Sequence, residues 1–153
     1  MSPRPLSRSQ VRWARVWMTV VLMGAFVFAI GLDPDLIGMD RSPVVGFVQV
    51  GVWLAGLGVI WIAAYAALRV IRNGLPKTLR SDIGLRLIAT GYVLSAAASL
   101  ADFIGLGAHR LPEVYFGPLQ VVGLVIGMLI SLAGTLLYLP GRRRQPPPSS
   151  PSD

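Results

Sequence analysis

The stretch from Pro118 to Leu139 reads PLQVVGLVIGMLISLAGTLLYL and contains no charged side chain. A helix needs about 20 mostly apolar residues to cross the roughly 30 Å of hydrocarbon in a bilayer. Inside that hydrocarbon, each backbone N–H and C=O must be paired within its own segment, and a helix does this. This stretch is therefore predicted to be a membrane-spanning helix.

Three other segments share this composition, at about residues 13–32, 44–68 and 85–106, and the fourth covers 118–139. The first has a short apolar run, Val16 to Leu32, and reaches the required length by including Trp13. The alternation expected of membrane-barrel strands is missing. The predicted fold class is all-α, a polytopic membrane protein built as a four-transmembrane-helix up-down bundle. The helical domain (16–140) lies between a basic tail (1–15) and a disordered basic and Pro/Ser-rich tail (141–153).

The overall composition supports the same class. Residues of the set AVILMFWYC make up 54% of the 153 residues, and charged residues only 14%, against about 25% in soluble domains. The formal net charge is +7, but the basic residues lie at the ends of apolar runs, which argues against nucleic-acid binding. The chain has no cysteine, which excludes disulfides and cysteine-based metal or redox chemistry.

The basic residues also predict an orientation, because cytoplasmic loops of membrane proteins carry an excess of Lys and Arg. Twelve of the 14 basic residues fall in the N-terminal tail, the connection between the second and third spans, and the C-terminal tail. Both termini are therefore predicted to be cytoplasmic, as in a plasma-membrane or bacterial inner-membrane protein. An alternative is a signal peptide cleaved after Ala29, since small residues at Val27 and Ala29 fit such a site.

The connections are about ten residues long, which predicts that consecutive helices are adjacent and antiparallel. In the first connection, Asp33 followed by Pro34 is typical of a helix N-cap, and a short interfacial turn bearing Leu36, Ile37 and Met39 is expected. In the middle connection, Asn73-Gly74 and Pro76 predict a turn.

Small residues recur at steps of four on the third and fourth spans. Helices in lipid associate through close backbone contact at such residues, and hydrogen bonds between helices add to this. The pattern predicts a helix-packing interface, within one chain or between chains, made of Gly91, Ser95, Ser99, Gly123, Gly127, Ser131 and Thr135. A second series on the third span is Ala97, Ala101 and Gly105.

Aromatic residues of the second span allow two interpretations. Trp53, Trp61 and Tyr65 lie well inside the apolar segment. They are either a wall for a pigment, lipid or quinone, or bulky packing residues whose indole N–H groups find a partner. The second interpretation is favoured.

Asp102 is the main candidate for intramembrane chemistry. It lies sixteen residues after Arg86, about 24 Å along a helix, so at least one of the two side chains enters the hydrocarbon. A short carboxylate there must be paired, protonated or in a wet cavity. The expected partners are Arg41 and Arg110, giving an intramembrane ion pair, and a proton or cation site is the alternative.

No reaction-competent set of residues emerges from the sequence. The only histidine, His109, falls in a connection, and no span offers a haem ligand or a zinc site. No catalytic, cofactor-binding or metal-binding residue is predicted. The expected function is that of a non-enzymatic accessory, assembly or structural subunit acting through helix–helix packing, in the lipid bilayer and with a membrane-protein partner or as a homo-oligomer. The alternative is a small transporter or channel using Asp102, with Gln49 or Gln120 along the pathway.

Overall fold

The computed structural model describes residues 7–38, 46–72, 78–101 and 117–140. In chain order, the elements are α1 (Arg8–Leu32), the 3-10 helix η1 (Pro34–Ile37), α2 (Phe47–Arg72), α3 (Leu79–Leu100) and α4 (Pro118–Tyr138). Each of the four α-helices is long and apolar enough to cross a membrane, and these described ranges contain no strand. The prediction of an all-helical chain with four such helices is confirmed.

Helices α1 and α3 begin earlier than the predicted spans, at residue 8 rather than 13 and at residue 79 rather than 85. Capping explains the difference. The Ser7 hydroxyl accepts a hydrogen bond from the Gln10 N–H (3.2 Å), and the Gln10 side chain accepts one from the Ser7 N–H (2.8 Å). Thr78 and Ser81 form the same reciprocal pair. The apolar composition marks only the apolar part of each helix, whereas the caps mark where the helix begins.

The turn after α1 has the predicted cap. The Asp33 carboxylate accepts a hydrogen bond from the Asp35 N–H (3.2 Å), and Pro34 occupies the first position of η1. Gly38 ends this turn in the left-handed region, with φ of 66°. The prediction of an N-cap at Asp33 followed by a short turn is confirmed.

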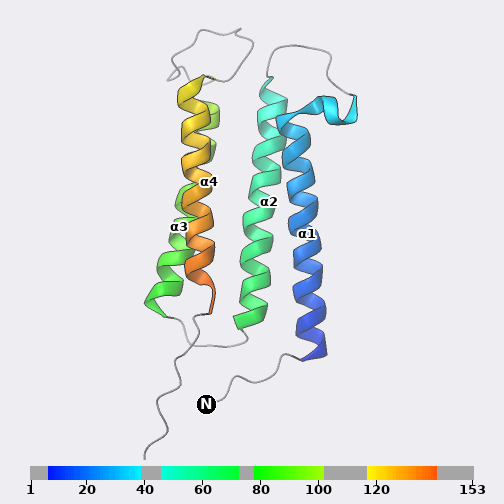
Figure 1. The fold of residues 1–153 in the computed structure, drawn as a ribbon, viewed down its shortest axis with the longest axis vertical. Helices are drawn as coiled ribbons and strands as arrows, with labels where there is room; N and C mark the ends of the chain where they lie inside the picture. Colours follow the sequence, from blue (N-terminus) through cyan, green and yellow to red (C-terminus); the bar gives the residue numbers. More distant parts are fainter. Residues whose placement is uncertain (1–6, 39–45, 73–77, 102–116, 141–153) are drawn as a thin grey trace, which may run out of the picture.

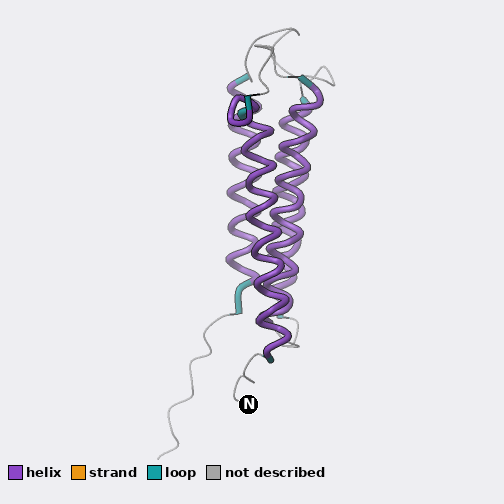
Figure 2. The backbone as a smooth tube through the Cα atoms, turned by 90° about the vertical axis from the view of Figure 1, so that its right-hand side faces the viewer, coloured by secondary structure: helices purple, strands orange, loops and turns teal. Residues whose placement is uncertain are grey.

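The four helices are arranged as two antiparallel hairpins, α1 with α2 and α3 with α4 (Figure 1). Within each hairpin the two helices are in contact along most of their length, whereas contact between the hairpins is much sparser and comes mainly from α2. Viewed from the side, all four helices follow one long axis (Figure 2). Helix α1 therefore lies at the edge of the molecule, with α2 between it and the second hairpin.

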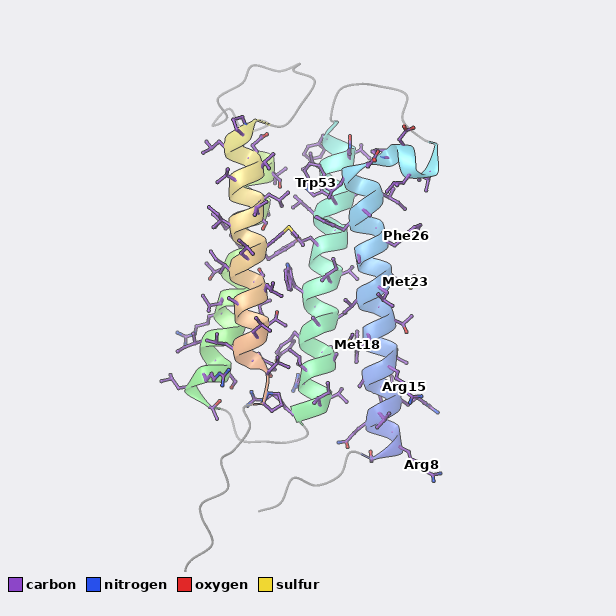
Figure 3. The ribbon with its side chains drawn as sticks, viewed as in Figure 1. Arg8, Arg15, Met18, Met23, Phe26 and Trp53 are labelled. Atoms are coloured by element: carbon purple, nitrogen blue, oxygen red, sulfur yellow. The ribbon has the colours of Figure 1, made fainter. Side chains whose placement is uncertain are left out.

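One buried cluster joins three of the helices. Val50, Trp53 and Leu54 of α2 are almost fully buried, and Phe28 of α1 and Ala96 and Leu100 of α3 pack against them. Trp53 lies near the end of α2 that is reached after the first connection (Figure 3). Its burial agrees with the packing interpretation of this residue.

Candidate functional site

The α3–α4 interface is built on small residues. A Cβ atom added at Gly91 would overlap the Gly127 carbonyl oxygen and the Ser131 hydroxyl, and one added at Gly127 would overlap Ser95. The two backbones therefore lie directly against each other. Gly91, Ser95, Ser99, Gly127 and Ser131 are all buried between the helices.

Hydrogen bonds between α3 and α4 reinforce this contact. The Ser95 hydroxyl donates to the Leu124 carbonyl oxygen (3.2 Å), and the Ser131 hydroxyl donates to the Ile88 carbonyl oxygen (3.0 Å). Both serines are completely buried. Ser99 instead donates to the Ser95 carbonyl of its own helix (2.8 Å). Two of the predicted serines thus bridge the helices through the backbone of the neighbour.

The line of contact differs from the predicted stripe at its ends. Gly123 is half-buried beside Ala98, and Thr135 is half-buried with its hydroxyl donating to the Ser131 carbonyl of α4. Steps of four residues rotate by 40° each time around a helix of 3.6 residues per turn, so a strict stripe drifts off the contact face. The observed line alternates steps of four and three and continues through Gly134 rather than Thr135.

Glycines seven residues apart occur on all four helices, and on three of them both glycines are buried at a helix interface, a signal that the predicted stripes miss. Gly84 and Gly91 lie on α3, and Gly127 and Gly134 on α4, all buried in the α3–α4 interface. A Cβ atom at Gly84 would lie 2.7 Å from the Gly134 carbonyl oxygen. Seven residues are close to two full turns, so each pair occupies one face of its helix.

The α1–α2 interface uses the same spacing. Gly24 and Gly31, again seven apart, are the two buried residues of α1. A Cβ atom at Gly31 would overlap the backbone of Trp53, and one at Gly56 would overlap the backbone of Phe28. Here too the backbones touch, but two of the glycines lie against the backbone of residues with large side chains, Trp53 and Phe28.

A polar cluster joins the two hairpins where α2 and α4 end. The Arg72 guanidinium donates from Nη1 to the Tyr138 carbonyl oxygen (3.1 Å) and lies 4.8 Å from the centre of the Tyr138 ring. The Tyr65 ring lies 5.3 Å from the Tyr138 ring. Arg72 is only 8% exposed, so this residue, which the sequence shows merely as one of many basic end residues, caps the last carbonyls of α4.

A second contact between the hairpins lies nearer the start of α2. The Tyr92 hydroxyl donates to the Leu54 carbonyl oxygen (3.2 Å), and Tyr92 also packs over Gly58. Trp61 is half-buried; its indole N–H is shielded from solvent and has no hydrogen-bond acceptor among the described residues. The residues Leu54, Gly58, Trp61 and Tyr65 follow steps of four and three, which places them on one side of α2.

The residues of the predicted ion pair, Asp102, Arg41 and Arg110, all lie outside the described residues. Arg86 is exposed on α3. Both amides proposed for a transport pathway are instead engaged at helix ends. The Gln49 side chain donates to the Leu32 carbonyl at the end of α1 (3.5 Å), and the Gln120 side chain accepts from the Gly117 N–H before α4 (3.0 Å).

Within the described parts of the chain, no three His, Asp or Glu residues gather in a way that could hold a metal ion. No protein-family model, no curated protein and no solved structure matches this chain. The interfaces themselves are therefore the features from which a function must be argued.

Proposed function

We propose that this chain is an integral membrane protein whose four helices each span the bilayer, with both termini and the α2–α3 connection on the cytoplasmic side. The first residues of α1 and the last residues of α4 lie at the same end of the molecule (Figure 1). Arg8, Arg12 and Arg15 of α1, Arg69 of α2 and Arg80 of α3 also belong to this end. A concentration of Arg at one end fits the positive-inside rule for a bacterial inner-membrane protein.

Fusions of a reporter enzyme test this orientation. Two reporters are used, one active only in the cytoplasm and one active only outside it. After Arg144 only the cytoplasmic reporter should be active, and at Gly38 only the external reporter. The opposite pattern would overturn the proposed orientation. Retention of α1 is also expected, because Gly24 and Gly31 pack it along α2, and the mass of the mature protein should include residues before Ala29.

The proposed activity is that of an accessory or assembly subunit, without catalysis of its own, which binds another membrane protein or a second copy through helix packing. The observation that carries this proposal is an open face on α2. Two of its sides are used: Gly56 and Trp53 contact α1, and Leu54 and Gly58 contact α3. The third side carries the exposed residues Val48, Gly51, Ala55 and Ile62, and Val59, which contacts Gly24, lies at its border with α1.

This open face has the features of a helix-docking surface in lipid. A Cβ atom added at Gly51 would meet none of the described residues within 4 Å, so the backbone on this face leaves room for another helix. Ala55 follows at a step of four, and Ile62 is 68% exposed. Small residues admit the close backbone approach that drives association in membranes. The α3–α4 stripe, by contrast, is occupied within the chain.

The test replaces Gly51 and Ala55 together with Leu. Because no described residue lies within 4 Å of a Cβ atom at Gly51, the protein should remain folded, while a partner purified with it in mild detergent should be lost at least tenfold. The matched control is a pair of equally exposed small residues on the other hairpin, Ala89→Leu with Ala133→Leu, which should retain the partner. Equal retention by both variants would eliminate the α2 face as the interface.

A further inference from the structure

The face of α1 that is turned away from α2 carries basic residues near the start of the helix, followed by exposed apolar residues. Arg8, Arg12 and Arg15 are exposed and surround, with Val11, a shallow open hollow of about 380 Å³. At 100° per residue, these three arginines fall within an arc of about 60° around the helix. Gly24 and Gly31, which contact α2, lie about 150° away from that arc. Arg8 and Arg15 accordingly point away from the rest of the protein (Figure 3).

The same face continues as apolar surface towards the middle of α1. Leu22 is 69% and Phe26 63% exposed, and steps of four and three residues connect them with the arginines through Thr19. Arg15 and Phe26 are eleven residues apart, about 16 Å along the helix axis. That distance is close to half of the roughly 30 Å hydrocarbon thickness, which is the depth of one lipid leaflet.

We propose that this face of α1 binds one anionic phospholipid, with its phosphate between Arg8, Arg12 and Arg15 and an acyl chain along Leu22 and Phe26. The inference rests on the proposed insertion of α1 in the bilayer. Guanidinium groups bind phosphate oxygens through paired, charge-assisted hydrogen bonds. In a zwitterionic lipid, the positive group of the headgroup neutralises the phosphate and repels the arginines, so an anionic lipid is favoured. The backbone N–H groups of the α1 N-terminus are not needed, because Ser7 already caps the helix.

The described arginines of α2 and α3 at the same end of the molecule differ from those of α1. Arg72 is buried and bound to Tyr138, so it is unavailable to lipid. Arg69, Arg80 and Arg86 are exposed, but they are spread over α2 and α3 instead of following one face. These three arginines supply a control with the same change of charge.

The experiment measures binding of single lipid molecules to the purified full-length chain by native mass spectrometry in detergent. Phosphatidylglycerol and cardiolipin are compared with phosphatidylcholine, and glycerophosphate is added as a soluble phosphate. The wild-type chain should bind the anionic lipids at least tenfold more tightly than phosphatidylcholine. Glycerophosphate should not compete, because it lacks the acyl chain.

The triple variant Arg8→Gln, Arg12→Gln, Arg15→Gln should bind the anionic lipids about a hundredfold more weakly, since each basic residue at an anionic surface contributes roughly fivefold. The charge-matched variant Arg69→Gln, Arg80→Gln, Arg86→Gln should stay within about threefold of wild type. Equal losses in the two variants would overturn the proposal, because overall charge alone would then explain binding.

A third variant tests the acyl part of the site. Leu22→Ala with Phe26→Ala should weaken binding of long-chain anionic lipid while leaving helix content unchanged, because both side chains are exposed. Unchanged affinity, together with competition by glycerophosphate, would show that only a phosphate is bound and would overturn the lipid assignment. The partner assay uses the α2 face, so loss of partner binding and loss of lipid binding are separate results.

Discussion

In the α1–α2 hairpin, the closest approaches are made at Gly24, Gly31 and Gly56, and the groups that meet these glycines carry no hydroxyl. The α3–α4 hairpin has equally close approaches at its glycines and adds the bonds from Ser95 and Ser131 to backbone carbonyls of the opposite helix. The first hairpin is thus held by shape along its length, with one bond from the Gln49 side chain to the Leu32 carbonyl at its end, whereas the second adds hydrogen bonds within the interface. Since lipid tails are as apolar as the helices, backbone proximity is the requirement that both share.

The largest expected effect comes from removing that proximity. Gly127→Leu and Gly31→Leu each place a branched side chain where backbone atoms of the neighbouring helix lie, and each should cost at least about 3 kcal/mol of stability. Reversible unfolding in mixed micelles containing sodium dodecyl sulfate measures the change. Gly51→Leu, which fills open space, is the control and should be close to neutral. If Gly31→Leu were tolerated while Gly127→Leu was not, close backbone contact would be required in the second hairpin only.

An intermediate effect is expected where the hairpins meet each other. Arg72→Ala removes the bond to the Tyr138 carbonyl and the contact with its ring, and should cost about 2 kcal/mol. The exposed Arg69, one turn earlier, is the control, and Arg69→Ala should stay within about 0.5 kcal/mol of wild type.

The variant Arg72→Ala should also let the two hairpins move apart, while each hairpin keeps its own two helices together. Because the chain has no cysteine, spin labels can be attached through single introduced cysteines at the exposed positions Ile62 and Leu132. In Arg72→Ala the distance between these labels should become longer or broader, while a pair at Ile62 and Met23 should be unchanged. A broadened distance within the first hairpin would contradict this description.

The smallest expected effect tests the hydrogen bonds between α3 and α4, which distinguish the second hairpin from the first. Ser131→Ala deletes one hydrogen bond between helices and should cost about 0.6 kcal/mol, the average for such bonds in membranes. Thr19→Ala in the first hairpin is the control, because the Thr19 hydroxyl donates only to the Arg15 carbonyl of its own helix. The same unfolding assay applies, and equal changes in both variants would show that the bond across α3 and α4 adds nothing specific.

The number and type of helices follow from the sequence because each apolar segment is long and almost uncharged, and such a signal is local. The approximate place of the α3–α4 contact was also accessible, because small residues such as Gly91 and Ser95 recur on one face. The exact line was not, since steps of four residues rotate away from the contact and Gly134 replaces Thr135 on it. A spacing of seven between glycines also selects Gly24 and Gly31. It equally selects Gly51 and Gly58 of α2, and Gly51 is exposed, so the spacing alone does not identify the contact.

The connection between the hairpins could not be predicted in the same way. Arg72 looks like any basic residue at the end of a membrane helix, and only the position of α4 reveals that its guanidinium caps Tyr138. Likewise, Gln49 and Gln120 read as polar residues near apolar segments, and only the structure shows that they bind backbone groups at helix ends. The roles of Arg72 and Gln49 depend on residues far apart in sequence, which no local pattern encodes, whereas Gln120 binds Gly117 only three residues away, in a local capping arrangement.

The pairing of neighbouring helices has a consequence for the order of folding. Each hairpin joins segments that follow each other directly along the chain, so the entropic cost of closing it is that of a short loop. The first hairpin is able to close while the second is still being synthesised. The bond from Arg72 to Tyr138 spans 66 positions and forms only after α4 is complete. A ribosome-bound intermediate ending before α4 should therefore already contain a closed first hairpin, in which Arg72 is not yet bound to Tyr138.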